Sequence, residues 1–477
     1  MAASMKTRRW MLGQGAALAG AAALTACGGS AAPGGTTSTG AAVSPAAGGT
    51  PGAATQVTIK GKLIVLEKKD FNEKQNQFLF DDVTAFADSK KWPLDISYTE
   101  GFTGGTNFYQ KISGAVSAGD SPDMMIGDYS AFQLWDLKSV QPVDDVVAAI
   151  VKDYGDPIPG LKYADNFQGK WWAVPYFARV DGYWARKSWF DPISFDINAQ
   201  HSMQDWLDAA LKVSDASKQR WGYGNSVNRS GDGETNVRDV VFGAGGRYTD
   251  QSGTKVAFNS PETIAGYEWL KDVYTNQKWA PALPPGVNAW TDISNNQALL
   301  AGTIGFTRNG GTLFASANTD APEIAKDMFF VPVPTSPVGK KEAISGPAGA
   351  SLYLFAGAKN PDAAKQVMQH LLSKEILKKI WAFTPGYPTP GYKWGWDEPE
   401  VVNTPNNVSK QFQKMVYGTT FFTWMPGPEP KLWIDAIGDA VVLTDTMAAI
   451  LGGQAVKDAV ADGHKKIEAI RDKFEGK

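Results

Sequence analysis

Polar side chains that could contact a ligand follow three predicted strands early in the chain. Residues 63–66 form a continuous apolar run typical of a buried parallel strand, residues 94–98 alternate between apolar and polar, and residues 124–126 form a third strand. Ligands of open α/β sheets bind at the carboxyl ends of the strands, so we expect the loops after these segments to line a binding site. The candidate side chains in these loops are Glu67, Lys68, Asp70, Glu100, Thr103, Asp128 and Tyr129.

Aromatic residues gather in several local groups, some of them in loops beside glycine and proline. An aromatic ring offers a rigid apolar face at little cost in conformational entropy, and Tyr and Trp add a polar tip. A carbohydrate has apolar C–H faces and a rim of hydroxyls, so a sugar site would combine such rings with planar polar groups. Most of the aromatic residues are expected in the core. The candidate rings for a binding site are Tyr176, Trp290, Tyr387 and Trp424.

Catalytic and metal-binding chemistry have little support in the residue spacing. Cys27 is the only cysteine, and the three histidines are scattered, so neither a metal site nor another cofactor is expected. The chain has no Gly-x-Ser-x-Gly motif, and no pair of carboxylates stands out as a catalytic pair. We therefore expect a binding protein and not an enzyme.

Chain length and net charge further limit the class of protein and the kind of partner. The chain has 477 residues, which suggests two or three domains, and 43% of them are hydrophobic, enough for a sizeable core. Its 46 basic and 49 acidic residues give a net charge of −3. Nucleic-acid binding leaves a basic footprint, so nucleic acid is not expected as the partner.

The N-terminus predicts export and membrane attachment. Basic residues precede an apolar stretch at 11–24, and Arg8-Arg9 within 7–12 resembles a twin-arginine signal. The sequence 24–27 resembles a bacterial lipobox, which would make Cys27 the lipidated first residue of the mature protein. We therefore expect a signal peptide over 1–26. Residues 27–56 lack charged side chains and are rich in small residues, which predicts a flexible tether on the outer side of the cell membrane.

The folded part alternates strand and helix patterns, which indicates α/β layers with right-handed crossovers. Two later helices have clear start signals. Ser260-Pro261-Glu262 and Asn360-Pro361-Asp362 each offer an N-cap, a proline in the first turn and an acidic residue.

Five segments with characteristic patterns follow one another along this part of the chain. They are the Ala-Gly-x-x-Pro-Asp turn at 118–123, the Gly-Lys-x-x-x-x-Pro segment at 169–175, the aromatic segment 183–190, the glycine-rich segment 301–310 and the Gly-Tyr-Pro-Thr turn at 386–389. This ordered set, behind a lipobox, resembles the extracellular solute-binding proteins of ABC importers. Within that family it is similar to the sugar-binding group that includes maltose-binding protein.

The resemblance implies a type II periplasmic-binding-protein fold, with two hinged α/β lobes that are each built on a mainly parallel sheet. The implied crossings between the lobes lie near 179–181, 342–345 and 383–385. The implied lobes are 57–179 with 344–384, and 180–343 with 385–477.

The resemblance also places ligand residues by position. Asp128 and Tyr129 would form the pocket edge after the third strand, and Arg179 and Asp181 would lie at the first crossing. The remaining positions implied by the resemblance are Arg308, Asn309, Trp433 and Trp424.

The expected function is that of a membrane-tethered, monomeric receptor that closes on a sugar or oligosaccharide and delivers it to an ABC permease. Two alternatives remain open, a lipoprotein that binds an extended polysaccharide and a secreted glycoside hydrolase with two opposed carboxylates. A narrower question concerns Arg179 and Arg308. Because arginine pairs well with carboxylates, the two residues either hold an acidic sugar or brace the lobes through salt bridges.

Overall fold

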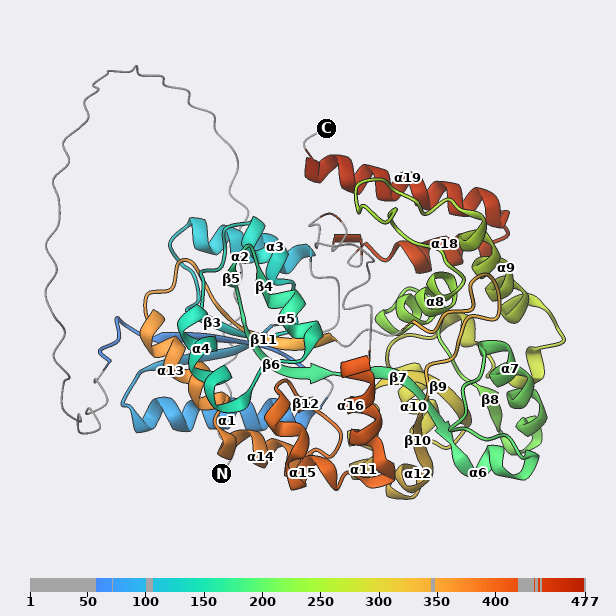
Figure 1. Ribbon diagram of the computed structural model, residues 1–477, viewed down its shortest axis with the longest axis horizontal. Coiled ribbons are helices and arrows are strands. Elements are labelled where there is room, and N and C mark those ends of the chain that lie inside the picture. Colours follow the sequence, from blue (N-terminus) through green and yellow to red (C-terminus); the bar gives the residue numbers. More distant parts are fainter. Residues whose placement is uncertain are drawn as a thin grey trace, which may run out of the picture. The chain divides into compact units, whose positions relative to one another are not determined.

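The computed structural model describes residues 57–70, 72–99, 106–344, 348–418, 433, 436–437 and 440–475. The predicted signal peptide, the tether and Cys27 lie outside these residues. The strands in the described part form a six-stranded, a four-stranded and a two-stranded sheet. The two larger sheets carry the elements that position the candidate site (Figure 1).

The first sheet has the strand order β12-β6-β11-β3-β1-β2. Strand β1 pairs in parallel with both β2 and β3, whereas β11 runs antiparallel between β3 and β6. The three strands predicted at the start of the chain are therefore confirmed. The strand bounds are β1 (Leu63–Lys68), β2 (Leu94–Thr99), β3 (Met124–Gly127), β6 (Val174–Arg179), β11 (Ala348–Leu354) and β12 (Thr389–Pro390).

Helices cover both faces of the first sheet. Met124 and Ile126 pack in a first hydrophobic cluster with helices α1, α4 and α13, and Met125 between them packs on the opposite face with α2 and α3. This alternation follows from the two-residue period of a strand. Asn72 caps α1 by accepting a hydrogen bond from the Gln75 backbone. The helix bounds are α1 (Glu73–Ser89), α2 (Thr106–Ser117), α3 (Ala131–Asp136), α4 (Asp144–Tyr154) and α13 (Pro361–Leu371).

The second sheet has the order β10-β7-β9-β8, and a second hydrophobic cluster packs helices against it. The strands are β7 (Asp181–Arg186), β8 (Trp221–Tyr223), β9 (Ile304–Gly310) and β10 (Met328–Val331). The helices in this cluster are α7 (Met203–Val213), α8 (Gly231–Gly243), α9 (Pro261–Thr275), α18 (Val442–Leu451) and α19 (Val456–Glu475).

Both predicted helix starts are present, but only one of them has the predicted side-chain cap. The Ser260 side chain caps α9 by accepting from the Thr263 backbone, as predicted. Asn360 makes no such cap on α13. Its side-chain amide donates to the Lys62 carbonyl and to Asp123, so it ties the start of β1 to the helix instead.

The chain passes between the two large sheets at Val180, the single residue between β6 and β7. The first hydrophobic cluster continues under both sheets, because it includes Trp184 of β7, Phe314, Phe330 of β10 and Phe412. The expected return to the second lobe at 385 needs correction. Strand β12 pairs with β6, which keeps residues 389–390 in the first sheet.

The remaining elements connect and flank the sheets. They are α5 (Pro159–Asp165), β4 (Asn166–Phe167), β5 (Lys170–Trp171), α6 (Lys187–Phe190), η1 (Asp191–Ile193), η2 (Ala216–Lys218), η3 (Ala280–Ala282), η4 (Val287–Ala289), α10 (Ser294–Leu300), α11 (Gly311–Asp320), α12 (Pro322–Asp327), α14 (Lys374–Phe383), η5 (Lys393–Asp397), α15 (Pro399–Val402), η6 (Pro405–Asn407) and α16 (Val408–Gly418).

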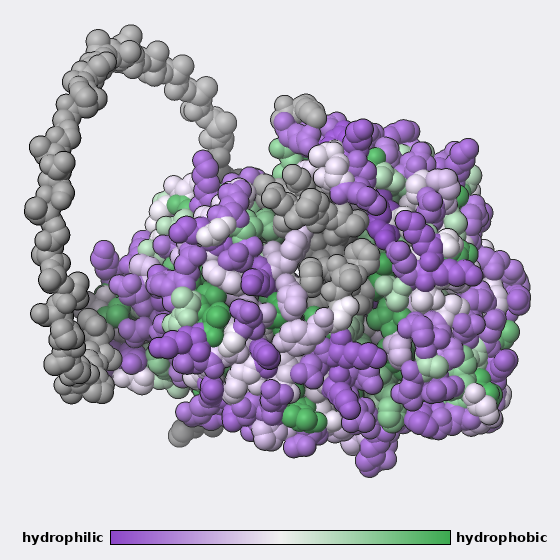
Figure 2. Space-filling model, viewed as in Figure 1, coloured by the Kyte–Doolittle hydropathy of each residue, from purple (hydrophilic) through white to green (hydrophobic). Residues whose placement is uncertain are grey.

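Within the described ranges, none of the helices combines the length and the apolar character that a membrane span requires. On the face shown in Figure 2, polar side chains predominate and apolar ones form small separate groups.

Candidate functional site

The ends of three strands of the first sheet bring a carboxylate between two cations. Asp128 follows β3 directly, Lys68 ends β1 and Arg179 ends β6. Lys68 Nζ lies 2.5 Å from Asp128 Oδ1, and Arg179 Nη1 lies 2.6 Å from Asp128 Oδ2. Burial alone would raise the pKa of the Asp128 carboxyl, but the two cations outweigh burial and hold this pKa below its ordinary value. We call these three residues the first triad.

Tyr129 is packed beside the first triad. Its ring stacks on Phe108 with centroids 3.7 Å apart, and Tyr109 meets it edge-on at 5.7 Å. Lys68 Nζ lies 4.8 Å from the centroid of the same ring, within the range of a cation–π contact. The Tyr129 backbone carbonyl accepts a hydrogen bond from the Tyr353 hydroxyl. The ring is thereby fixed at the end of β3.

Arg179 lies in a strongly negative environment. Burial lowers its pKa, but Tyr387 and the carboxylates of Asp128, Asp181 and Asp70 outweigh burial, so the pKa lies well above the ordinary value. The Tyr387 hydroxyl donates to Asp70, which connects the turn before β12 to the loop after β1. The Arg179 guanidinium is therefore permanently charged and already compensated.

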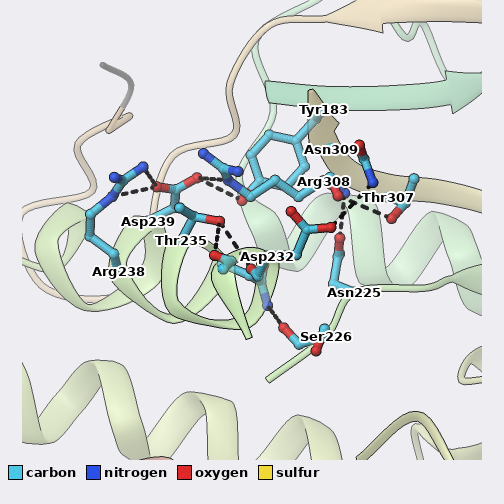
Figure 3. A network of polar contacts seen from close by, with 12 residues as sticks. Tyr183, Asn225, Ser226, Asp232, Thr235, Arg238, Asp239, Thr307, Arg308 and Asn309 are labelled. Atoms are coloured by element: carbon cyan, nitrogen blue, oxygen red, sulfur yellow. Dashed lines mark hydrogen bonds and ion pairs between the residues drawn. The ribbon is translucent and has the colours of Figure 1, made fainter. Parts of the chain in front are cut away.

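At the second sheet a carboxylate also lies between two cations, as in the first triad, and Figure 3 shows this arrangement from close by. Asp239 of α8 accepts from Arg238 through Oδ1 and from Arg308 of β9 through Oδ2, and both distances are 2.8 Å. The Tyr183 hydroxyl donates to the same Oδ2 at 3.1 Å. Asp239 is 2% and Arg308 4% exposed, so this second triad of Arg238, Asp239 and Arg308 is an interior ion-pair network.

The first turn of α8 adds another carboxylate beside Arg308. Asp232 Oδ2 accepts from the side-chain amides of Asn295 at 2.8 Å and Asn309 at 3.2 Å. Burial and the neighbouring Asp292 raise the pKa of Asp232 to about 7, although the Asn295 hydrogen bond and Arg308 oppose this. A negative charge at this position is thus poorly compensated.

Asp181 lies between the two triads along the chain. It begins β7 directly after the crossing at Val180, and it pairs with Gly310 in β9. Its carboxylate contributes to the raised pKa of Arg179 and also to the raised pKa of Arg308. Asp181 therefore interacts electrostatically with one arginine of each sheet.

Gly310 leaves room for the Asp181 carboxylate. A Cβ atom at Gly310 would lie 2.5 Å from Asp181 Oδ1. Gly310→Ala is therefore expected to lower the free energy of unfolding by about 1–3 kcal/mol, as overpacking does. Chemical denaturation measures the change. The control is Gly114→Ala on α2, where a Cβ meets nothing within 4 Å and a small gain in stability is expected. Equal effects of the two substitutions would contradict the packing argument.

Two further predicted residues are buried. Glu67 is 1% exposed and lies on the same face of β1 as Leu63 and Val65, and its Oε2 has no hydrogen-bond partner among the described residues. Burial, together with Asp70 and Glu73, raises the pKa of Glu67 to about 9. Tyr176 is buried as well, and its hydroxyl likewise lacks a described partner.

The predicted aromatic platforms contribute to packing. Trp290 is partly buried against both the first and the second hydrophobic cluster. Trp433 is 4% exposed within the second cluster, and Tyr387 is buried in the first. Glu100 and Trp424 lie outside the described residues.

The structure thus brings Asp128, Tyr129, Arg179, Asp181 and Tyr387 together, and it joins Arg308 with Asn309 on the second sheet. The sequence reasoning did not select several residues of this network. The missed residues are Asn225, Asp232, Arg238, Asp239 and Asn295, whereas Lys68 and Asp70 were named among the loop residues.

The sequence contains a pattern that indicates the two buried carboxylates of α8. Asp232 and Asp239 are seven residues apart, which places both on one face of a helix. An arginine inside strand β9, which is buried along its whole length, also requires a buried acidic partner.

A cavity of about 300 Å³ lies elsewhere, beside η3 and η4. Its lining includes Trp221, Tyr274, Leu283 and Val287 and none of the predicted site residues. Among the residues that the structure describes, no group of three or more His, Cys, Asp or Glu side chains is placed to hold a metal ion.

Two α/β sheets joined by a short strand crossing, with charged groups gathered at the strand ends of both, define the class of two-lobed solute-binding proteins. The family model for the bacterial extracellular solute-binding proteins matches residues 94–378, and the chain belongs to this family.

Solved structures agree with the two-lobed fold. The fold is similar to that of maltose-bound MalE3 of T. maritima, at 17% sequence identity and a TM-score of 0.72 over 85% of this chain and 99% of that chain. It is also similar to a solute-binding protein of Agrobacterium vitis with bound D-mannitol, at 20% identity and a TM-score of 0.71 over 87% and 99% of the chains. A sugar transporter of Arthrobacter chlorophenolicus with bound laminaribiose matches at 15% identity and 0.70 over 86% and 99%. No curated protein sequence matches this chain.

Proposed function

We propose that this protein is an extracytoplasmic receptor that binds a sugar or polyol between its two lobes and delivers it to an ABC importer. The observation that carries the proposal is the polar network at the crossing, in which Asp181 acts on both Arg179 and Arg308. Hydroxyl groups both donate and accept, so a polyhydroxylated solute can donate to the carboxylates and accept from the cations. The bound maltose, D-mannitol and laminaribiose of the similar structures support this ligand class.

Binding would act through a hinge equilibrium. The β6–β7 crossing leaves only Val180 between the sheets, so a small change of backbone angles there would move one lobe against the other. A solute that contacts groups of both lobes only in the closed state shifts the population toward closure. We assign 57–179 with 348–418 to the first lobe, and 180–343 with 440–475 to the second.

The tether belongs to the same proposal. A lipid on Cys27 would hold the receptor near its permease, and residues 28–56 would give it reach. Support comes from the sequence around Cys27, with a charged and then apolar leader before it.

Ligand screening tests the function. A bound neutral sugar or polyol is expected to stabilise the folded protein by about 2.7 kcal/mol at a concentration one hundred times the dissociation constant. Thermal denaturation in the presence of mono- and disaccharides, hexitols, amino acids and polyamines measures this gain. Small-angle scattering with and without the stabilising solute then reports closure. The proposal fails if no small solute stabilises the protein while it degrades or retains a polysaccharide.

A further inference from the structure

We infer that the binding site accepts solutes without negative charge and excludes their acidic counterparts, and that Asp181 is a determinant of this selection. The inference rests on the proposed function, because it specifies which sugars or polyols the site can take. It also answers the question, open from the sequence, of whether Arg179 and Arg308 serve an acidic ligand.

The first step is that both arginines already have carboxylate partners. Arg179 is bound to Asp128 at 2.6 Å, and Arg308 is bound to Asp239 at 2.8 Å. An acidic sugar needs a guanidinium whose charge is not yet compensated. Exchanging an internal partner for a solute carboxylate would break an ion pair in a partly or fully buried network and leave Asp128 with Lys68 alone or Asp239 with Arg238 alone, which is costly.

The second step is the balance of charge around the two triads. The network contains four cations and six carboxylates, of which Asp232 has a pKa of about 7, so a further anion would find no cation without a carboxylate partner. The cations are Lys68, Arg179, Arg238 and Arg308. The carboxylates are Asp70, Asp128, Asp181, Asp232, Asp239 and Asp292.

The raised pKa of Asp232 also indicates that the site disfavours a further negative charge. Burial, Asp292 and Asp181 raise its pKa to about 7, although Asn295 and Arg308 oppose the shift. The protein environment therefore already disfavours a negative charge beside Arg308. An incoming carboxylate would meet the same penalty.

The third step is the position of Asp181. Its side chain is half-buried and forms no hydrogen bond or ion pair with another described residue, so its oxygens are free to accept from solute hydroxyls. It acts on the guanidiniums of both sheets. A solute placed against the partly exposed Arg179 would therefore meet the Asp181 carboxylate, which attracts hydroxyl donors and repels carboxylates.

The test compares matched solutes on the full chain. Isothermal titration calorimetry is carried out with maltose and maltobionate, D-mannitol and D-mannonate, and D-glucose and D-glucuronate. For any pair that binds, the acid is expected to bind at least tenfold more weakly than its neutral partner. Asp181→Asn is expected to reduce this ratio at least fivefold, mainly through tighter binding of the acid.

The matched control is Asp462→Asn on α19, an exposed carboxylate that pairs with Lys465. It is expected to leave the ratio unchanged. An acid that binds the wild-type protein as tightly as its neutral partner overturns the inference and leaves the proposed function standing. An unchanged ratio in folded Asp181→Asn removes Asp181 as a determinant. If none of the six solutes nor any compound of the wider screen binds, the proposed function fails and the inference fails with it.

Discussion

Replacing Asp239 with alanine is expected to lower the free energy of unfolding by about 3–5 kcal/mol, the usual cost of removing one partner of a buried ion pair. Asp239 joins Arg238 and Arg308, with both distances at 2.8 Å, and it accepts from the Tyr183 hydroxyl. The alanine variant leaves the Arg308 charge 4% exposed and without its carboxylate. Among the described residues, Asp239 is the acidic group paired with Arg308.

Denaturant unfolding followed by tryptophan fluorescence measures this loss. Asp462→Ala is the control, since its ion pair with Lys465 is exposed on α19 and surface pairs contribute less than about 1 kcal/mol. A loss below about 1 kcal/mol for Asp239→Ala would contradict the description of the second triad as an interior network.

Glu67→Gln is expected to raise the free energy of unfolding by about 3 kcal/mol at pH 7, at about 1.4 kcal/mol for each pH unit between the ordinary pKa and neutrality. Burial, with Asp70 and Glu73, raises the Glu67 pKa from 4.5 to about 9. The unfolded chain releases this proton above its ordinary pKa, so the folded protein must take it up. A glutamine amide is neutral in both states and removes that requirement.

The sign of the pH dependence follows from the same proton. Between pH 4.5 and about 9, only the folded state of wild type holds the proton, so its free energy of unfolding falls as the pH rises. The advantage of Glu67→Gln should therefore be small at pH 5 and grow to pH 9. Urea unfolding at pH 5, 7 and 9 checks this trend, with Glu268→Gln on the exposed side of α9 as the control. A constant difference across this range would contradict it.

The local elements of the fold were predictable because each depends on neighbouring residues. The apolar run 63–66 and the alternating 94–98 became β1 and β2, and the cap at Ser260 opens α9. The insertion of β11 between β3 and β6 was not predictable, since periodicity indicates which face is buried and not which strand pairs with which. The same limit applies to β12, which was assigned to the wrong lobe.

The candidate site was predictable in part for a related reason. Strand ends converge at one edge of a sheet, so Asp128 could be named from its place after β3. Its bonds to Lys68 and Arg179 depend on strands that are distant in sequence. Aromatic residues near glycine and proline gave a weaker signal, since Tyr387 is buried and Trp290 is partly buried. A loop composition does not tell whether a ring faces solvent or the interior.

The continuous apolar interior beneath both sheets has a consequence for how the protein can be divided. Trp184 stacks on Phe314 with centroids 5.3 Å apart, and Phe412 of α16 meets Trp184 edge-on at 5.9 Å. Helix α16 follows β12, a strand of the other sheet. A polypeptide cut at Val180 would keep these rings on one fragment but would separate β11 and β12 from their partners β3 and β6, so each fragment would expose apolar surface. The two sheets therefore belong to one compact unit that a single continuous chain builds.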